Sequence, residues 1–215
     1  MRKAINVVII GLLFSLLAIT PAQAHFGNGS LIDIPIADGL REDQVSLSYQ
    51  YFNAAGKNII NLQYGTADIL QAGINLETDF DEILNPYPSL KAKLLTEEDL
   101  TPAVAAGLIN RSRYLVASQT IPYQDIRIHY GLGDREHFSD YVFVGASKVL
   151  NPVSISTGDA SFKTPTTTIM ADYNAAFNLG FNFSFDSTFE LDLSGVDLFR
   201  DSRDFSFKLN FKNVF

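Results

Sequence analysis

The chain has 215 residues, of which 24 are acidic and 16 are basic, and its formal net charge is −8. This excess of negative charge argues against nucleic acid as a partner. The absence of cysteine excludes a disulfide framework, a thiolate metal site and a cysteine nucleophile. Stability therefore has to come from the fold alone.

The first residues have the pattern of a secretory signal. Arg2 and Lys3 form a positive start, the stretch from Val7 to Ile19 is almost continuously apolar, and Ala22-Gln-Ala24 supplies a small-residue cleavage site. The apolar stretch is shorter than the ~20 residues that a membrane-spanning helix needs. We therefore expect residues 1–24 to be a cleaved signal peptide.

Beyond the signal, short segments alternate apolar and polar residues. In the first of them, Val45, Leu47 and Tyr49 share one face, while Ser46 and Ser48 share the other. Most connectors are short and rich in turn residues, so neighbouring strands should be antiparallel. The segments number about twelve, the clearest being 45–51, 60–64, 126–130, 177–185 and 189–193.

Prolines interrupt the alternating pattern in two regions. Asp79 to Pro88 contains two prolines and is predicted to be a connector. Glu97 to Asn110 is the best helix candidate, but Pro102 interrupts it and favours a turn followed by a strand. No stretch after the signal approaches ~18 consecutive apolar residues, which excludes a later spanning helix.

The alternation indicates a barrel in a membrane rather than a soluble sandwich. The polar faces are rich in Asn, Ser, Gly and Gln, whereas the outside of a soluble sheet collects Lys, Glu and Thr. About ten residues, tilted by ~40°, cover the ~25 Å apolar band of a membrane. We predict an all-β, transmembrane, antiparallel up-and-down β-barrel of about 12 strands in the cell outer membrane, formed by residues 44–215. Residues 25–43 should form an N-terminal segment that is either periplasmic or plug-like.

The polar faces provide the candidates for the lumen wall. They carry isolated charges among amides and hydroxyls, as a confined hydrated lumen requires. The lumen-lining candidates are Gln50, Gln63, Lys91, Lys93, Arg127, His129, Asn178, Asn182, Glu190, Asp192, Lys208 and Asn210.

The C-terminal segment is typical of the last strand of an outer-membrane barrel. Phe205, Phe207, Leu209 and Phe211 alternate with polar residues, and Phe215 supplies a terminal aromatic residue. As a resemblance, this looks like the strand that the barrel-assembly machinery recognises. The expected partners are thus this machinery and outer-membrane lipid.

Several segments resemble the outer-membrane barrel of the YjbH-like exopolysaccharide-biosynthesis family. They are Gly29 to Ala37 followed by Asp38-Gly39, Pro102 to Leu108, Tyr114 to Ser118, Ile126 to Gly133, and Asp172-Tyr-Asn174 leading into Phe177 to Gly180. The resemblance implies a barrel and makes polysaccharide a candidate partner.

Little in the sequence indicates catalysis. His25, His129 and His137 form no spaced ligand pair, and no nucleophile elbow or phosphate loop is present, so we predict no metal, no cofactor and no enzymatic activity. Ser118 could meet His129 or His137 across strands, but a hydrogen-bonded filler role is favoured for His129.

Two functional hypotheses remain. The first is a porin-like barrel, either a small pore or an accessory, for the passage or surface display of a polar solute or exopolysaccharide. The alternative is a soluble periplasmic β-barrel or sandwich that binds a ligand.

Overall fold

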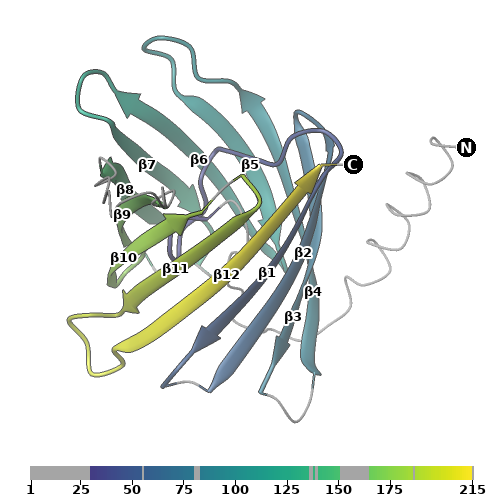
Figure 1. Ribbon diagram of the computed structural model, residues 1–215, viewed down its shortest axis with the longest axis vertical. Helices are drawn as coiled ribbons and strands as arrows, with labels where there is room; N and C mark the ends of the chain where they lie inside the picture. Colours follow the sequence, from purple (N-terminus) through teal and green to yellow (C-terminus); the bar gives the residue numbers. More distant parts are fainter. Residues whose placement is uncertain are drawn as a thin grey trace, which may run out of the picture.

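The computed structural model describes residues 30–54, 56–79, 83–135, 138, 140–150, 165–185 and 187–214. Within them, twelve strands form one closed antiparallel barrel in which each strand pairs with its neighbours in sequence (Figure 1). The predicted all-β, up-and-down barrel of about twelve strands is confirmed. The predicted signal peptide, His25, His137 and Phe215 lie outside the described residues. The strands are β1 (Gln44–Phe52), β2 (Lys57–Ala67), β3 (Leu70–Thr78), β4 (Ile83–Leu95), β5 (Ala103–Ile109), β6 (Ser112–Ile121), β7 (Ile126–Gly133), β8 (Val142–Leu150), β9 (Thr166–Tyr173), β10 (Phe177–Ser184), β11 (Phe189–Val196) and β12 (Asp204–Val214).

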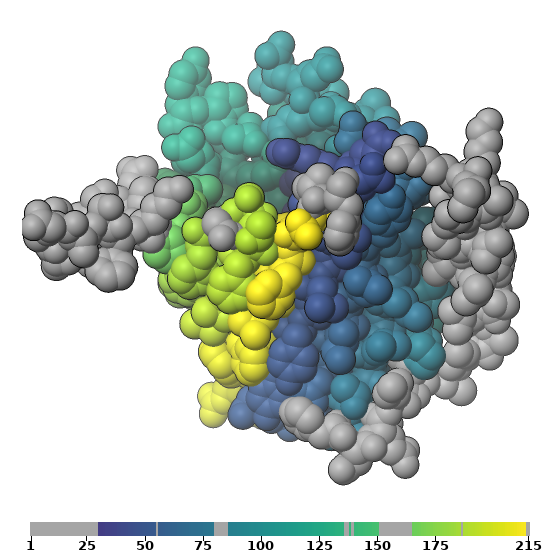
Figure 2. Space-filling model, turned by 45° about the vertical axis from the view of Figure 1, so that its right-hand side comes forward, coloured from purple at the N-terminus to yellow at the C-terminus, as the bar shows by residue number. Residues whose placement is uncertain are grey.

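The first and last strands close the ring. β1 pairs with β12 from Gln44↔Val214 to Phe52↔Ser206 without a register shift. Figure 2 shows β12, in yellow, lying along β1 on the surface of the molecule. We call the end at which β1 begins and β12 ends the proximal end, and the opposite end the distal end.

Burial along the strands is inverted relative to a soluble protein. In β1, Ser46 and Ser48 are buried, whereas Leu47 between them is 46% exposed. In β12, Ser206 and Lys208 are buried while Phe205 and Phe211 are about half exposed. The apolar face points outward on both strands, as a barrel in lipid requires. Among the described residues, no helix is long and apolar enough to cross a membrane.

The prediction that Asp79 to Pro88 is a connector is wrong at its C-terminal end. β4 begins at Ile83 and includes Pro86 and Pro88. The carbonyl of Pro88 accepts a hydrogen bond from Asn110 N–H, so the backbone N–H and C=O groups of the even-numbered residues of β4 point towards β5. Pairing with β5 ends at Ser89↔Ile109. Both prolines thus lie beyond the end of β5, where a missing N–H removes no ladder bond.

The stretch from Glu97 to Asn110 is a turn followed by β5, as predicted, and contains no helix. Thr101 N–H donates to Glu98 O over 2.7 Å and closes the turn before Pro102. β5 then contributes Ala103, Ala105 and Ile109 to the inner face of the barrel.

Residues 30–41, which we call the inner segment, lie inside the barrel and are drawn in purple in Figure 1. Ile34 and Ala37 are fully buried although neither belongs to a strand. Near the distal end, the backbone of Ile32 contacts Asp172 of β9, close to the β9–β10 turn. Near the proximal end, a Cβ built on Gly65 of β2 would lie 2.0 Å from Arg41 O, so only glycine allows the main chain to cross there. The inner segment therefore runs along the lumen towards the start of β1.

Substitutions on the two faces of β12 should separate lipid contact from lumen contact. Leu209 lies across from Tyr49 on β1 and Leu191 on β11. Leu209→Arg puts a charge on the lipid face and should cost ~2–4 kcal/mol of folding free energy in vesicles, measured by denaturant unfolding. The control is Lys208→Asn combined with Asp192→Asn, which removes an inward ion pair whole and should cost much less. Equal losses would mean that the faces are assigned wrongly.

Candidate functional site

The lumen wall has a polar sector formed by β1, β2, β3, β10, β11 and β12. Amide side chains of adjacent strands bond to one another there: Gln71 donates to Gln63, and Asn61 donates to Asn75. Ser46 Oγ donates to Asn210 across the β1–β12 closure, over 3.0 Å. Of the lumen candidates named from the sequence, the buried members of this sector are Gln50, Gln63, Asn178, Asp192, Lys208 and Asn210.

Charges in this sector are paired across strands. Asp192 and Lys208 approach to 3.0 Å, and Glu190 and Lys212 approach to 2.7 Å. Each carboxylate accepts a further hydrogen bond from an amide: Asn182 donates to Asp192 over 2.6 Å, and Asn210 donates to Glu190 over 2.8 Å. The two acids thus balance two lysines in a wall without excess charge.

The opposite sector of the wall, from β4 to β9, carries an apolar cluster that includes side chains of the inner segment. Buried polar residues of the same strands, such as Ser118 and His129, lie beside this cluster. Close approach of strands to large rings shapes this sector: a Cβ on Gly131 would lie 2.3 Å from the ring of Phe143. The rings of Phe138 and Phe143 stack with centroids 4.7 Å apart. The wall members of the cluster are Tyr87, Ala103, Ala105, Ile109, Tyr114, Val116, Phe138, Phe143 and Met170.

The apolar side chains of the inner segment pack on this sector. Leu31, Ile32 and Ile34 are at most 6% exposed. A Cβ built on Gly145 of β8 would lie 2.7 Å from both Leu31 Cδ2 and Ile34 Cδ1, so glycine makes the room that these side chains fill. Full burial of each such side chain contributes ~1.5–3 kcal/mol. Apolar packing therefore holds the distal half of the inner segment.

Asp172 anchors the backbone of the inner segment. Its Oδ2 accepts hydrogen bonds from the N–H groups of Ile32 and Asp33, each with an N···O distance of 2.9 Å. Asn178, another lumen candidate, donates to Asp172 Oδ1 over 2.7 Å and orients the carboxylate. Asp172 was not among the lumen residues predicted from the sequence, although it lies on the same face of β9 as buried Met170.

Ser118 and His129 meet beneath the inner segment. Ser118 Oγ lies 2.8 Å from His129 Nδ1 and accepts the Ala37 N–H over 2.9 Å. The hydroxyl hydrogen is thus directed to Nδ1, and His129 Nε2 lies 3.4 Å from Ser147 Oγ, where a catalytic triad would need a carboxylate. Both side chains are at most 1% exposed. The pair therefore fills space inside the barrel as a hydrogen-bonded unit, and Ser118 Oγ is not accessible as a nucleophile.

An ionic latch holds the proximal part of the inner segment. Arg127 of β7 donates from Nη2 and Nε to the two carboxylate oxygens of Asp38, over 2.9 and 3.1 Å. Its Nη1 donates to Glu97 of the β4–β5 connection and to Thr120 Oγ1. Lys91 Nζ donates to the carbonyls of Ile36 and Asp38, over 3.2 and 2.7 Å. We refer to Arg127, Asp38 and Glu97 as the latch.

The latch affects the acidity of Glu97, which lies outside the strands. Burial by itself would raise the pKa of Glu97, but hydrogen bonds from Arg127 and Thr120, together with the positive charge of Arg127, outweigh it and lower the pKa below 4.5. Glu97 is therefore ionised, and the latch is complete, at neutral pH.

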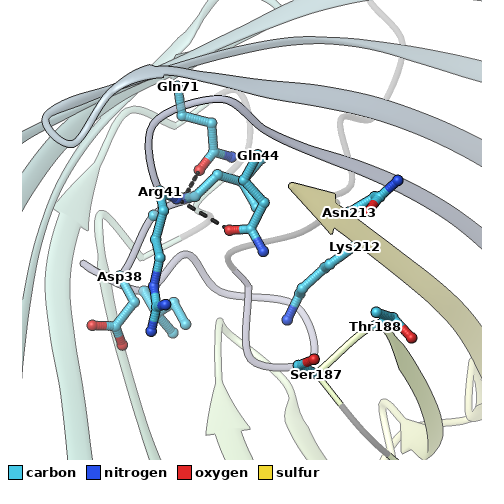
Figure 3. A pocket seen from close by; sticks show the side chains of 11 residues that line it. Asp38, Arg41, Gln44, Gln71, Ser187, Thr188, Lys212 and Asn213 are labelled. Atoms are coloured by element: carbon cyan, nitrogen blue, oxygen red, sulfur yellow. Dashed lines mark hydrogen bonds between the residues drawn. The ribbon is translucent and has the colours of Figure 1, made fainter. Parts of the chain in front are cut away.

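A cavity of about 530 Å³ lies at the proximal mouth. In Figure 3, Asp38 and Arg41 of the inner segment border it on one side, and Lys212, Ser187 and Thr188 border it on the other. Deeper in the lumen, between Leu31, Ile32 and the polar sector, the space is only about 10 Å³, the size of a single water site. Lys93, which is half-buried, lies near Leu40 at a second cavity of about 10 Å³.

The described residues contain no group of three or more histidine or acidic side chains that could hold a metal ion. The paired lysines and acids of the polar sector instead form a wall that can hydrogen-bond to a polar occupant.

No family model and no curated protein matches the chain. Among solved structures, the chain is similar to the KdgM porin, with 10% identity and a TM-score of 0.48 over 80% of this chain and 99% of that one. It is likewise similar to the KdgM porin in complex with disordered oligogalacturonate, with 9% identity and a TM-score of 0.47 over the same shares.

Loss of the latch should loosen the inner segment without opening the barrel wall. Since the chain has no native cysteine, a single Ala37→Cys substitution gives a unique buried probe. Arg127→Gln should speed maleimide labelling of this cysteine about tenfold, because hydrogen bonds between charged groups contribute ~1.5–3 kcal/mol. Arg111→Gln, in the exposed β5–β6 turn, is the control and should leave the rate unchanged. Equal rates in both variants would contradict the latch.

The contribution of Glu97 to the stability of the fold should decrease as the pH falls. A carboxyl group with a lowered pKa stabilises the fold above its ordinary pKa, and this effect is lost as pH falls through the folded-state value. Wild type should therefore have a higher Tm in detergent than Glu97→Gln at neutral pH, and the difference should shrink below pH 4.5. Glu98→Gln, at the exposed neighbouring position, should show no such trend. A Tm difference that grew in acid would refute the ion pair.

Proposed function

We propose that this protein is an outer-membrane channel for small polar solutes whose own inner segment plugs the lumen. The apolar outer face of the barrel favours a location in lipid over the alternative of a soluble periplasmic protein. The proximal end then faces the periplasm, which receives both ends of the barrel. Barrel-assembly machinery and outer-membrane lipid remain the partners that we propose.

One observation favours a plugged channel over a barrel that its own side chains fill and that has only a structural role. The wall holds the inner segment through polar side chains that come from distant strands, namely Asp172, Ser118, Gln71, Lys91 and Arg127. Side chains alone fill a barrel of about eight strands, whereas wider barrels enclose space for an occupant. Withdrawal of the inner segment would leave a lumen with a continuous polar sector through which a hydrated solute could pass.

Planar-bilayer conductance tests this proposal. Ile34→Asp places a carboxylate in the fully buried apolar contact with β8 and should favour withdrawal of the inner segment. We expect brief or absent openings for wild type and sustained openings for the variant. Leu100→Asp adds the same charge in the exposed β4–β5 connection and should behave as wild type. Folded, inserted Ile34→Asp barrels that stay closed would show that the lumen is not a conduit.

The solute that we propose is an exopolysaccharide. The resemblance to the YjbH-like family makes exopolysaccharide the predicted cargo, for passage or surface display, and the amide-rich polar sector supports a carbohydrate. Adding polysaccharide fragments to open Ile34→Asp channels should reduce the current in proportion to their occupancy. Currents that neutral and acidic saccharides leave untouched would exclude this cargo.

A further inference from the structure

The wall makes contacts with the backbone of the inner segment that any peptide of the same shape could make. In that shape, Leu31 N–H donates to Ile34 O at 2.9 Å and closes a tight turn, and the chain then continues towards the proximal end. Asp172 accepts the N–H groups of residues 32 and 33, Ser118 accepts that of residue 37, and Gln71 accepts that of residue 40 over 3.0 Å. Lys91 donates to the carbonyls of residues 36 and 38. Four wall side chains thus satisfy backbone groups along the length of the inner segment, and hydrogen bonds to a peptide's main chain give affinity that does not depend on its side chains.

Three further features select the side chains of the occupant. The space over Gly145 accepts two branched aliphatic side chains, those of Leu31 and Ile34. A Cβ on Gly180 would lie 3.2 Å from Ile32 Cδ1, so β10 accepts a third. Arg127 faces the carboxylate of Asp38 with two hydrogen bonds. The preferred occupant therefore carries three aliphatic side chains in its distal half and a carboxylate near its proximal end.

These contacts are costly to leave unmade. Asp172, Ser118 and Lys91 are at most 6% exposed, and each directs a polar group at the inner segment. If the inner segment withdrew, they would turn to water, or to another peptide that supplies the same backbone groups. A polar solute such as a sugar could meet some of them, but it would leave the apolar sector uncovered.

We infer that the lumen is a binding site for a peptide in which a tight turn of aliphatic residues is followed by a carboxylate, and that the inner segment is its exchangeable resident. This inference rests on the proposed plug and specifies the ligand class that competes with it. A peptide supplied from outside the chain should occupy the same site whenever the inner segment is displaced.

Binding of a labelled peptide in solution tests the inference. The probe is a synthetic peptide with the sequence of residues 30–41 and a fluorophore, added to full-chain Ile34→Asp protein in detergent. Fluorescence anisotropy should show saturable binding that exceeds wild-type binding at least about tenfold, since the resident occupies the wild-type lumen. A peptide that itself carries Ile34→Asp should bind far more weakly. Adding Gly145→Val to the barrel should abolish binding, because the new side chain fills the space of Leu31 and Ile34.

The outcomes of these assays distinguish the peptide site from the plugged channel. Saturable binding that Gly145→Val removes supports the inference, and equal binding of both peptides overturns it. Sustained current through Ile34→Asp channels without peptide binding would leave the plugged channel standing and refute the peptide site. Binding without current would support the site and refute the conduit. Should Ile34→Asp fail to fold, Asp38→Lys, which changes an exposed residue and reverses its charge opposite Arg127, replaces it in the same assays.

Discussion

Closure of the sheet by β1 and β12 is the constraint on which the rest of the structure depends. Lipid offers no hydrogen bonds, so a sheet can cross a membrane only when no strand has a free edge. The unbroken register from Gln44↔Val214 to Phe52↔Ser206 provides this. Once the ring is closed, every second residue must face a confined interior, and polar residues such as Ser48 become buried while Leu47 beside it is exposed. The fold and its lumen therefore arise from the same pairing.

The lumen divides into two sectors because two kinds of partner have to be satisfied. On one side, Asp192 with Lys208 and Glu190 with Lys212 neutralise each other within the wall. On the other side, rings such as that of Phe143 belong to one apolar cluster with the aliphatic side chains of the inner segment. An open pore with this second sector exposed would present an apolar surface to water. The inner segment is thus part of the barrel's core as well as an obstruction of its lumen.

The period-two alternation predicted the architecture, since it reports directly which face of each strand is apolar. It predicted polar residues such as Gln63 for the inside, but it could not predict their partners, because which strands lie across the lumen from one another depends on the closed ring. Asp172 and Ile32 meet across 140 positions of the chain, and no local pattern links them. The aliphatic residues between Leu31 and Ala37, interrupted only by Asp33 and Pro35, were a signal that residues before β1 need burial. The start of β4 was predicted wrongly because of Pro86 and Pro88. The sequence alone does not show that these prolines lie beyond the end of β5, which depends on how the strands pair.

The location of the inner segment also bears on how the barrel can assemble. The segment precedes β1, and the strand that seals the ring, β12, is the last one in the barrel. The contacts that join β12 to β1 are distant in sequence, and such contacts form late in folding because chain entropy opposes them. The wall can therefore wrap around the segment, with no need for a peptide to thread through a finished ring. By this route the space inside the barrel is already occupied at the moment when it becomes enclosed.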